Sequence, residues 1–402
     1  MSNSAQHPDL TRRGWLRAPA VAAGIAFSVP VLAQQSETPA RNAPIQEENP
    51  DAWSPPPTDH GNLKNFKYPF AFGHNRRSAG GWAREVTVRD LPISTAMAGV
   101  NMRLEKGAIR ELHWHIPAEW AYMLYGEARI TGVDQNSNAF VSDVKKGDLW
   151  YFPTGIPHSI QGLSENGCEF LLVFDDGSFS EFSTFQITDW MAHTPRPVLA
   201  KNFGVPESTF DPIPKQELYI FPAPMPNSLE ADKRAAITQG EVPEPFDFHL
   251  LDIQPVKSNP SGEVRIADSK SFKASKTIAA ALVTLRPGGL RELHWHPRAD
   301  EWQYYISGKG RMTVFASGSI ARTTDFQAGD VGYVPRSHGH YVENTGNEDL
   351  VFLEMFRDSE YMDISLADWI AHLPPETVAA HLHLPLQVIE SINRQKQVIT
   401  GV

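Results

Sequence analysis

Residues 107–126 read GAIRELHWHIPAEWAYMLYG, and residues 289–308 read GLRELHWHPRADEWQYYISG. Each stretch contains RELHWH, then a glutamate followed by a tryptophan, and each ends on a glycine seven places after that glutamate. The two histidines of each HWH are two places apart, so on a β-strand both point to one face and the tryptophan between them points to the other. The sequence therefore predicts two equivalent sites, each built around a pair of inward-facing histidines.

Further metal-binding side chains follow at matching places in the two copies. A glutamate follows each pair after a short loop, and a third histidine ends a later stretch that begins Gly-Asp and contains a proline. The predicted ligands are His113, His115, Glu119 and His158 in the first copy, and His294, His296, Glu301 and His340 in the second. Three neutral imidazoles and one carboxylate, without a thiolate, suit a divalent ion such as manganese or iron. A chance cluster of histidines is the alternative, and the second complete copy weighs against it.

The composition indicates two globular domains made mainly of strands. The chain has 402 residues, 32 prolines and 28 glycines, with 41% hydrophobic and 21% charged residues. Many short apolar runs between turn residues favour strands, and the order of these runs repeats in the second half together with the DWMAH and DWIAH motifs. The predicted segments are a first domain at 62–205, a proline-rich connection at 206–247, a second domain at 248–385 and a tail at 386–402, with helix over 376–393.

The N-terminal segment is typical of an export signal. Arg12 and Arg13 precede an apolar run at 18–32 that ends in small residues, and the paired arginines resemble the twin-arginine type. The run is too short to span a bilayer comfortably, which disfavours a membrane anchor. We therefore expect residues 1–33 to be removed and the protein to be periplasmic or secreted. Residues 34–61, rich in proline, asparagine, glutamine and acids, are predicted to be a poorly ordered leader.

The charge balance and the cysteine content exclude several classes of protein. The formal net charge is −11, and removal of the predicted signal would make it −13, so no basic face is available for nucleic acid. Cys168 is the single cysteine, which excludes an intrachain disulfide and a cysteine-cluster metal site. No stretch after the signal is apolar enough to be a transmembrane helix.

The two motifs together resemble those of the cupins. The first motif is a glycine, HxH and a glutamate followed by a second glycine, and the second motif is a later Gly…Pro…His. From about residue 65 to 385 the chain resembles the bicupin oxalate decarboxylases of bacteria. Two departures leave the ligands intact: Gly162 stands where asparagine is usual, and Ser337 where glycine is usual. The resemblance implies an all-β fold of two tandem jelly-roll barrels with short flanking helices. It also implies one manganese per barrel, O2 as co-catalyst, oxalate as substrate and assembly as a homohexamer.

The resemblance also assigns roles to side chains outside the ligand sets. In the family a mobile lid over the first cup carries a glutamate in a Ser-Glu-Asn-Ser stretch; here the stretch is Ser-Glu-Phe-Ser, with Glu181 as the expected proton carrier and Phe182 in place of asparagine. Arg110 is expected beside oxalate, although strict alternation along a strand would turn it away from the histidines. In the second copy Arg291 is its counterpart, and Glu354 is either a proton donor or a partner of Arg291.

Several points stay open on the sequence alone. Glu360 precedes its DWIAH tryptophan by the same nine places as Glu181 precedes its counterpart, which suggests a second lid acid. Trp114 and Trp295 are expected to face away from the metals, either as packing residues or as an electron relay between cups across a subunit interface. His338 is expected to lie beside the ligands or at the surface, and not to be a ligand itself. An oxalate oxidase, giving CO2 and peroxide, and a non-enzymatic storage bicupin are the alternative functions. Glu181 disfavours the first, and the intact ligands disfavour the second.

Overall fold

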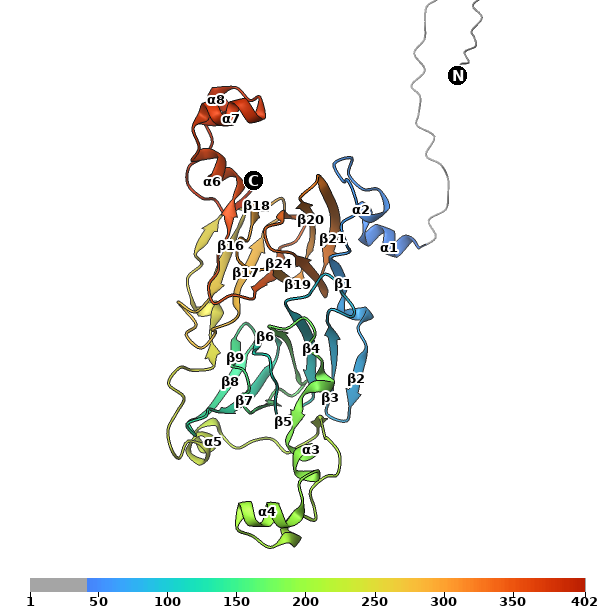
Figure 1. The fold of residues 1–402 in the computed structure, drawn as a ribbon, viewed down its shortest axis with the longest axis vertical. Helices are drawn as coiled ribbons and strands as arrows, with labels where there is room; N and C mark the ends of the chain where they lie inside the picture. Colours follow the sequence, from blue (N-terminus) through green and yellow to red (C-terminus); the bar gives the residue numbers. More distant parts are fainter. Residues whose placement is uncertain (1–41, 402) are drawn as a thin grey trace, which may run out of the picture. The chain divides into compact units, whose positions relative to one another are not determined.

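The computed structural model describes residues 42–401. The predicted export signal and the first part of the predicted leader lie outside these residues. Over the described residues the structure contains two domains of antiparallel sheets joined by short helices (Figure 1). None of the helices between residues 42 and 401 has the length and apolar character needed to cross a membrane.

The first domain consists of two antiparallel sheets. The seven-stranded sheet has the order β14-β9-β6-β11-β4-β3-β2, and the six-stranded sheet has the order β12-β5-β10-β7-β8 with β13 on the other part of β5. The first sheet comprises β2 (Asn75–Ser78), β3 (Gly81–Val86), β4 (Ala98–Leu104), β6 (Glu119–Tyr125), β9 (Leu149–Phe152), β11 (Cys168–Phe174) and β14 (Asp247–Phe248). The second comprises β5 (Ile109–Trp114), β7 (Glu127–Val133), β8 (Ala139–Lys145), β10 (His158–Gly162), β12 (Phe185–Gln186) and β13 (Ile220–Phe221).

The second domain repeats this topology strand for strand. Its seven-stranded sheet has the order β1-β22-β19-β24-β17-β16-β15, and its six-stranded sheet has the order β21-β20-β23-β18-β25 with β26 on β18. The first sheet comprises β1 (Lys67–Pro69), β15 (Lys257–Asn259), β16 (Gly262–Ala267), β17 (Ala279–Leu285), β19 (Glu301–Ser307), β22 (Asp330–Val334) and β24 (Leu350–Phe356). The second comprises β18 (Leu290–Trp295), β20 (Lys309–Ala316), β21 (Ile320–Gln327), β23 (Gly339–Asn344), β25 (Ile364–Ser365) and β26 (Ile399–Thr400).

Short helices flank the sheets. The α-helices are α1 (Ala43–Glu48), α2 (Pro50–Trp53), α3 (Ile187–Ala192), α4 (Arg196–Phe203), α5 (Leu229–Ala236), α6 (Leu366–Ala371), α7 (Pro375–Leu382) and α8 (Leu386–Glu390). The 3-10 turns are η1 (Phe70–Phe72), η2 (Glu181–Ser183), η3 (Glu207–Phe210) and η4 (Leu250–Asp252). The helix predicted over 376–393 is broken into α7 and α8 at His383, which has a left-handed φ of 55°.

The two seven-stranded sheets pack against each other through their outer faces. One apolar core cluster includes Val100 and Trp120 of the first domain together with Leu282 and Trp302 of the second. A side chain at Gly99 would lie 2.3 Å from the ring of Trp302, so glycine permits this close approach. Burial on both faces explains why β6 is apolar from Trp120 to Tyr125 instead of alternating.

The domains also exchange one strand each. Strand β1, from the N-terminal side, pairs with β22 of the second domain, and β14, from the end of the connection, pairs with β9 of the first. Lys67 on β1 places its Nζ 2.8 Å from the carboxylate of Asp330, which is 1% exposed. Strand β1 therefore lies within the range predicted for the first domain although it pairs with the second, and the predicted border at 248 falls inside β14.

Part of the predicted poorly ordered leader is folded. Residues 42–53 contain α1 and α2, and the backbone N–H of Asp51 donates to the carboxylate of Asp325 at 2.8 Å. The Asp51 carboxylate also pairs with Arg311. The prediction of disorder was wrong here because composition does not reveal a docking partner that lies far away in the sequence.

Candidate metal centres and active site

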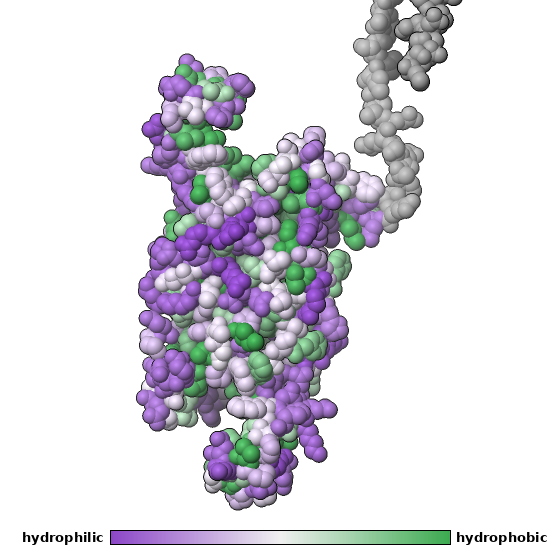
Figure 2. All heavy atoms as spheres, in the orientation of Figure 1, coloured by the Kyte–Doolittle hydropathy of each residue, from purple (hydrophilic) through white to green (hydrophobic). Residues whose placement is uncertain are grey.

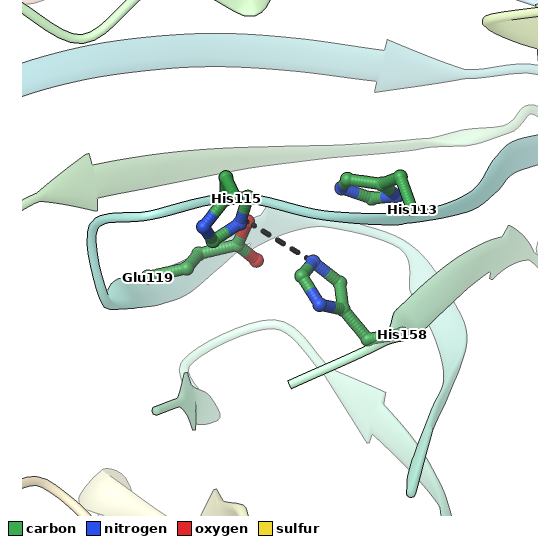
Figure 3. Close-up of side chains that lie close together, drawn as sticks. All are labelled: His113, His115, Glu119 and His158. Atoms are coloured by element: carbon green, nitrogen blue, oxygen red, sulfur yellow. Dashed lines mark hydrogen bonds and ion pairs between the residues drawn. The ribbon is translucent and has the colours of Figure 1, made fainter. Parts of the chain in front are cut away.

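The four predicted ligands of the first cup converge on one point (Figure 3). One ligand atom from each of them lies within 4.8 Å of the others, and all four residues are at most 3% exposed. His113 lies on β5 directly opposite His158 on β10, and Glu119 begins β6 in the facing sheet. Both sheets of the domain therefore contribute to the cup.

Hydrogen bonds to the backbone fix the orientation of the imidazoles. Nδ1 of His113, His115 and His158 lies 2.5, 2.6 and 2.7 Å from the carbonyl oxygens of Glu111, Pro117 and Ile156. A carbonyl only accepts, so each Nδ1 carries the proton and each Nε2 presents a lone pair to the cup. Burial, reinforced by the positive charge of Arg110, lowers the pKa of His113 well below its ordinary value, so this ring stays neutral. Burial likewise lowers the pKa of His158.

These lone pairs lack a donor in the first cup. The Oε2 of Glu119 lies 3.2 Å from Nε2 of His115 and 3.5 Å from Nε2 of His158. Both nitrogens are acceptors in the tautomer that the backbone imposes, and His158 Nε2 has no hydrogen-bond partner. A cation between them stabilises a buried set of acceptors that face one another. The residues present therefore fit a divalent metal ion.

The second cup has the same construction. Nδ1 of His294, His296 and His340 lies 2.7, 2.8 and 3.0 Å from the backbone oxygens of Glu292, Met362 and His338. Nε2 of His340 and of His296 lies 2.8 and 3.0 Å from Oε2 of Glu301. The backbone of His338 thus orients a ligand, while its half-buried side chain lies outside the ligand set, as predicted.

Each metal-binding carboxylate is oriented by a donor that the motif alone does not reveal. In the first cup Nε1 of Trp150 donates to Glu119 at 2.9 Å; in the second, Nε2 of Gln303 donates to Glu301 at 2.6 Å. The cross-strand partner of Trp150 is Ala121, and that of Gln303 is Gly332. A Cβ at Gly332 would lie 2.7 Å from the Gln303 amide oxygen. The side chain that donates to the glutamate therefore comes from β9 in the first domain and from β19 in the second. The residue opposite it on the paired strand is small in each case.

A bulge settles which way the two arginines point. Between His113 and Arg110 the strand β5 advances three residues, while the opposite strand β10 advances two, from His158 to Ile160. The extra residue shifts the alternation by one, so Arg110 faces the cup side and is 1% exposed. The same shift occurs beside Arg291 in β18, and this side chain is 0% exposed.

In the first cup the arginine is held by side chains from a loop. Nη2 of Arg110 lies 3.2 Å from Oε2 of Glu181, which is 5% exposed, and Nη1 donates to Gln186 at 3.2 Å. Glu181 opens the short turn η2, between the buried strand β11 and β12, and has no partner strand of its own. The predicted proton carrier is thus next to the predicted substrate-binding arginine. The guanidinium also lies 4.5 Å from the ring of Tyr219.

In the second cup the arginine is surrounded by fixed acidic groups. Nη2 of Arg291 donates to Asp363 at 2.6 Å and to the hydroxyl of Tyr361 at 2.7 Å, and Nε lies 3.4 Å from Glu354. Asp363 also pairs with Lys396 of the C-terminal tail. Burial, partly offset by the charge of Arg291, raises the pKa of Glu354 to about 7. Glu354 is therefore a neighbour of Arg291, and its role as a proton donor stays a prediction.

Glu360 does not occupy the position of Glu181. Its carboxylate lies 3.1 Å from Nζ of Lys270, and its side chain is 37% exposed. The hypothesis of a second lid acid therefore finds no support in the structure. Asp363 and Tyr361, three and one residues further on, are the groups that reach the arginine of this cup.

The chain segment after each domain closes the cup with a strained residue. The carbonyl of Tyr219 accepts from Arg110 at 3.5 Å, and the carbonyl of Val398 accepts from Arg291 at 3.2 Å. Both residues have left-handed φ angles, 60° and 62°, which is rare for a β-branched residue such as Val398. The buried glutamate of RELHWH anchors both segments: Glu111 accepts from the Tyr219 N–H at 2.9 Å, and Glu292 accepts from the Val398 N–H at 2.9 Å. Sequence reasoning missed these contacts, although the repeated glutamate was a signal.

The tryptophans of the HWH motifs face away from the metals, as the alternation predicts. Trp114 stacks on Phe185 with 5.4 Å between ring centroids and meets the edge of Trp190. Trp295 meets the edge of Trp369 in the same way. The contacted residues belong to β12, α3 and α6.

The fold and the two cups define a two-domain cupin with a metal centre in each domain. A cupin family model matches residues 71–210 and 248–389. The chain is 59% identical over 356 residues to oxalate decarboxylase OxdC of Bacillus subtilis (strain 168), covering 89% of this chain and 92% of the relative. It is 42% identical over 349 residues to a probable oxalate decarboxylase of Arthroderma benhamiae, covering 86% and 85%. The chain belongs to the oxalate decarboxylase family of bicupins.

Solved structures agree with this assignment. A structure from a study of the Mn(II) centres in Bacillus subtilis oxalate decarboxylase matches with a TM-score of 0.87 at 57% identity, covering 90% of this chain and 96% of that one. A structure of the Bacillus subtilis enzyme at pH 4.6 matches with a TM-score of 0.87 at 58% identity, covering 90% and 94%. The two cups of the present chain are manganese sites of the same type.

Proposed function

We propose that this protein is a manganese-dependent oxalate decarboxylase, which converts oxalate to formate and CO2. The similarity to the relatives named above supports the reaction. The observation that carries it in this chain is the buried carboxyl of Glu181, 3.2 Å from Arg110 on the cup side of β5. A proton carrier and a carboxylate-binding cation thus lie together beside one metal centre.

The metal, when bound, supplies a Lewis-acidic and redox-active centre for a small carboxylate. Arg110 would pair with the free carboxylate of oxalate, and to do so it must exchange its contact with Glu181 for one with the substrate. Glu181 is then released to move a proton. In the monoanion of oxalate, the proton leaves oxygen for Glu181, the C–C bond breaks, and CO2 departs. The carbon that keeps the electron pair takes the proton back, which gives formate.

The contacts of the two arginines favour the first cup as the site of turnover. Arg110 is held by Glu181 on a loop that can move, whereas Arg291 is held by Asp363 and Tyr361, with Lys396 behind them. Both ion pairs are buried, but to reach Arg291 oxalate would have to displace an acid that Lys396 also holds. We therefore assign Arg110 and Glu181 to catalysis, and Arg291 and Glu354 to the support of the second metal centre. Dependence on O2 as a co-catalyst is part of the same proposal.

Product analysis tests this function directly. The manganese-loaded protein is supplied with oxalate at mildly acid pH, and formate, CO2 and hydrogen peroxide are measured with and without O2. Formate and CO2 in equal amounts are expected. CO2 with stoichiometric peroxide would instead identify an oxidase, and unchanged oxalate would identify a binding protein.

We also propose that the mature protein is exported and forms a homo-oligomer. The paired Arg12 and Arg13 and the apolar run after them support export, which fractionation of the source cells would test. Exposed apolar side chains support self-association: they gather on α4 and from α6 to α8, and Figure 2 shows hydrophobic residues over the latter region. The residues are Val198, Phe203, Trp369, Leu373, Leu382, Leu386 and Val388. Light scattering should give the mass of six chains, and a monomer would contradict this part of the proposal.

A further inference from the structure

The segment that carries Glu181 is anchored at both ends by stacked aromatic rings. Phe179 stacks on Phe174 with 3.6 Å between ring centroids, and Phe185 stacks on Trp114 at 5.4 Å. Between these two anchors, residues 180–184 contain the turn η2 and pair with no strand. Few backbone hydrogen bonds hold this segment, so it can open locally without unfolding of the sheets.

Three contacts join residues 180–184 to neighbouring strands. The first is the Glu181 side chain on Arg110 of β5. The second is the backbone N–H of Glu181, which donates to Oε2 of Glu85 on β3 at 3.1 Å. The third is the ring of Phe182, whose centroid lies 4.4 Å from the guanidinium carbon of Arg76 on β2. When oxalate binds, it replaces Glu181 as the partner of Arg110. The other two contacts must then determine how the segment is held.

The contact between Phe182 and Arg76 has no packing role that would account for it. Phe182 is 66% exposed and adds little to the core. The Arg76 side chain is only 16% exposed, because its other side lies against Tyr219, with 3.5 Å between the guanidinium carbon and the ring centroid. Nη2 of Arg76 pairs with the carboxylate of Glu217, whereas Nη1 is buried and has no hydrogen-bond acceptor. An N–H group without an acceptor next to two aromatic rings is the arrangement of a cation–π contact.

We propose that Phe182 is a positioning residue, and that its ring on the Arg76 guanidinium latches the Glu181 segment over the first cup. The strands β2 and β3 provide the fixed side of this latch through Arg76 and Glu85. The consequence for turnover rests on the proposed function. Oxalate enters the first cup only while the segment is open, so the latch limits the entry of oxalate. Once the segment has closed, the latch keeps Glu181 in place. A partly exposed cation–π contact should change the open fraction by about two- to fivefold.

Hydrogen exchange of the segment measures the latch without any assay of activity. In Phe182→Ala and Phe182→Leu, exchange at the amides of residues 181 and 182 should be roughly two- to fivefold faster than in the wild type. Phe182→Trp should stay at or below the wild-type rate, because it keeps the π face. Phe72→Ala is the matched control: Phe72 is 69% exposed and touches Tyr68 but not the segment, so its loss should leave exchange at 181 and 182 unchanged.

A double-mutant cycle shows whether the effect passes through Arg76. In an Arg76→Gln background, Phe182→Ala should cause no further acceleration. An equal acceleration in both backgrounds, or a wild-type rate in Phe182→Leu, would overturn the latch.

Kinetics then test its role in turnover. In Phe182→Ala we expect kcat/KM for oxalate to rise by about the same two- to fivefold factor, while kcat does not rise. If Phe182 were merely structural, its loss would lower both kcat and kcat/KM, and that result would overturn the gating role. Faster hydrogen exchange with an unchanged kcat/KM would overturn it as well. A wild-type protein that leaves oxalate intact would refute the proposed function and leave the exchange measurement valid.

Discussion

Replacing the arginine of each cup by methionine should have opposite consequences in the two domains. Arg291 is 0% exposed and neutralises two buried acids, Asp363 at 2.6 Å and Glu354 at 3.4 Å. Its loss takes the cation away from Glu354 and leaves Asp363 with Lys396 alone, and breaking a buried ion pair typically costs about 3–5 kcal/mol. Arg110 is equally buried, but its acidic partner Glu181 lies on a segment that can turn to solvent. We therefore expect Arg110→Met to cost only about 1–2 kcal/mol.

Thermal unfolding and formate production, measured on the same manganese-loaded samples, separate these effects. At about 2 °C per kcal/mol, Arg291→Met should lower Tm by about 6–10 °C and Arg110→Met by about 2–4 °C. Formate production should fall at least about 100-fold in Arg110→Met and stay within about tenfold of wild type in Arg291→Met at a temperature where both remain folded. Equal losses of stability, or loss of activity only in Arg291→Met, would refute the division of roles between the cups.

Two further predictions concern the N-terminal segment. In urea unfolding, Lys67→Met should destabilise the protein by about 3 kcal/mol or more, because Asp330 is left buried without its cation. The control Lys270→Met removes the exposed ion pair with Glu360 and should cost at most about 1 kcal/mol. Burial, with the negative charge of Asp51, raises the pKa of Asp325 to about 6, above the value of about 3.9 in the unfolded chain. The folded segment thus favours the protonated acid, so docking of α1 and α2 should weaken as pH rises from about 4 through 6. After correction for the intrinsic pH dependence of exchange, hydrogen exchange of residues 43–53 in the wild type should become faster as the pH rises. Asp325→Asn should remove this pH dependence. The same pH dependence in Asp325→Asn would contradict the role of Asp325.

The ligands of both cups could be predicted from the sequence because each motif is local. The alternation of His113, Trp114 and His115 along one strand determines which side chains face inward, and a repeated motif shows that the pattern is no accident. The orientation of Arg110 could not be predicted this way. It depends on a bulge between β5 and β10, and a bulge is a property of two paired strands.

Contacts between distant segments account for what the sequence did not reveal. The helix α2 is held by Asp325, strand β26 pairs with β18, and the carboxylate of Glu119 is oriented by Trp150 from another strand. None of these partners is marked by local composition. Trp150 faces Ala121 in the first domain, and Gly332 faces Gln303 at the equivalent positions of the second. This swap of the large and the small residue can be recognised in the sequence only once the strand registers are known.

The most direct test of the account is formate production by Glu181→Gln and by Glu354→Gln, each with its manganese content measured. Neither residue belongs to a ligand set, so both variants should bind two manganese ions per chain. Glu181→Gln should lose about 100-fold or more of the formate production, because glutamine cannot carry the proton, and Glu354→Gln should remain within about tenfold of wild type. A fully loaded Glu181→Gln protein that produces formate at the wild-type rate would contradict the account.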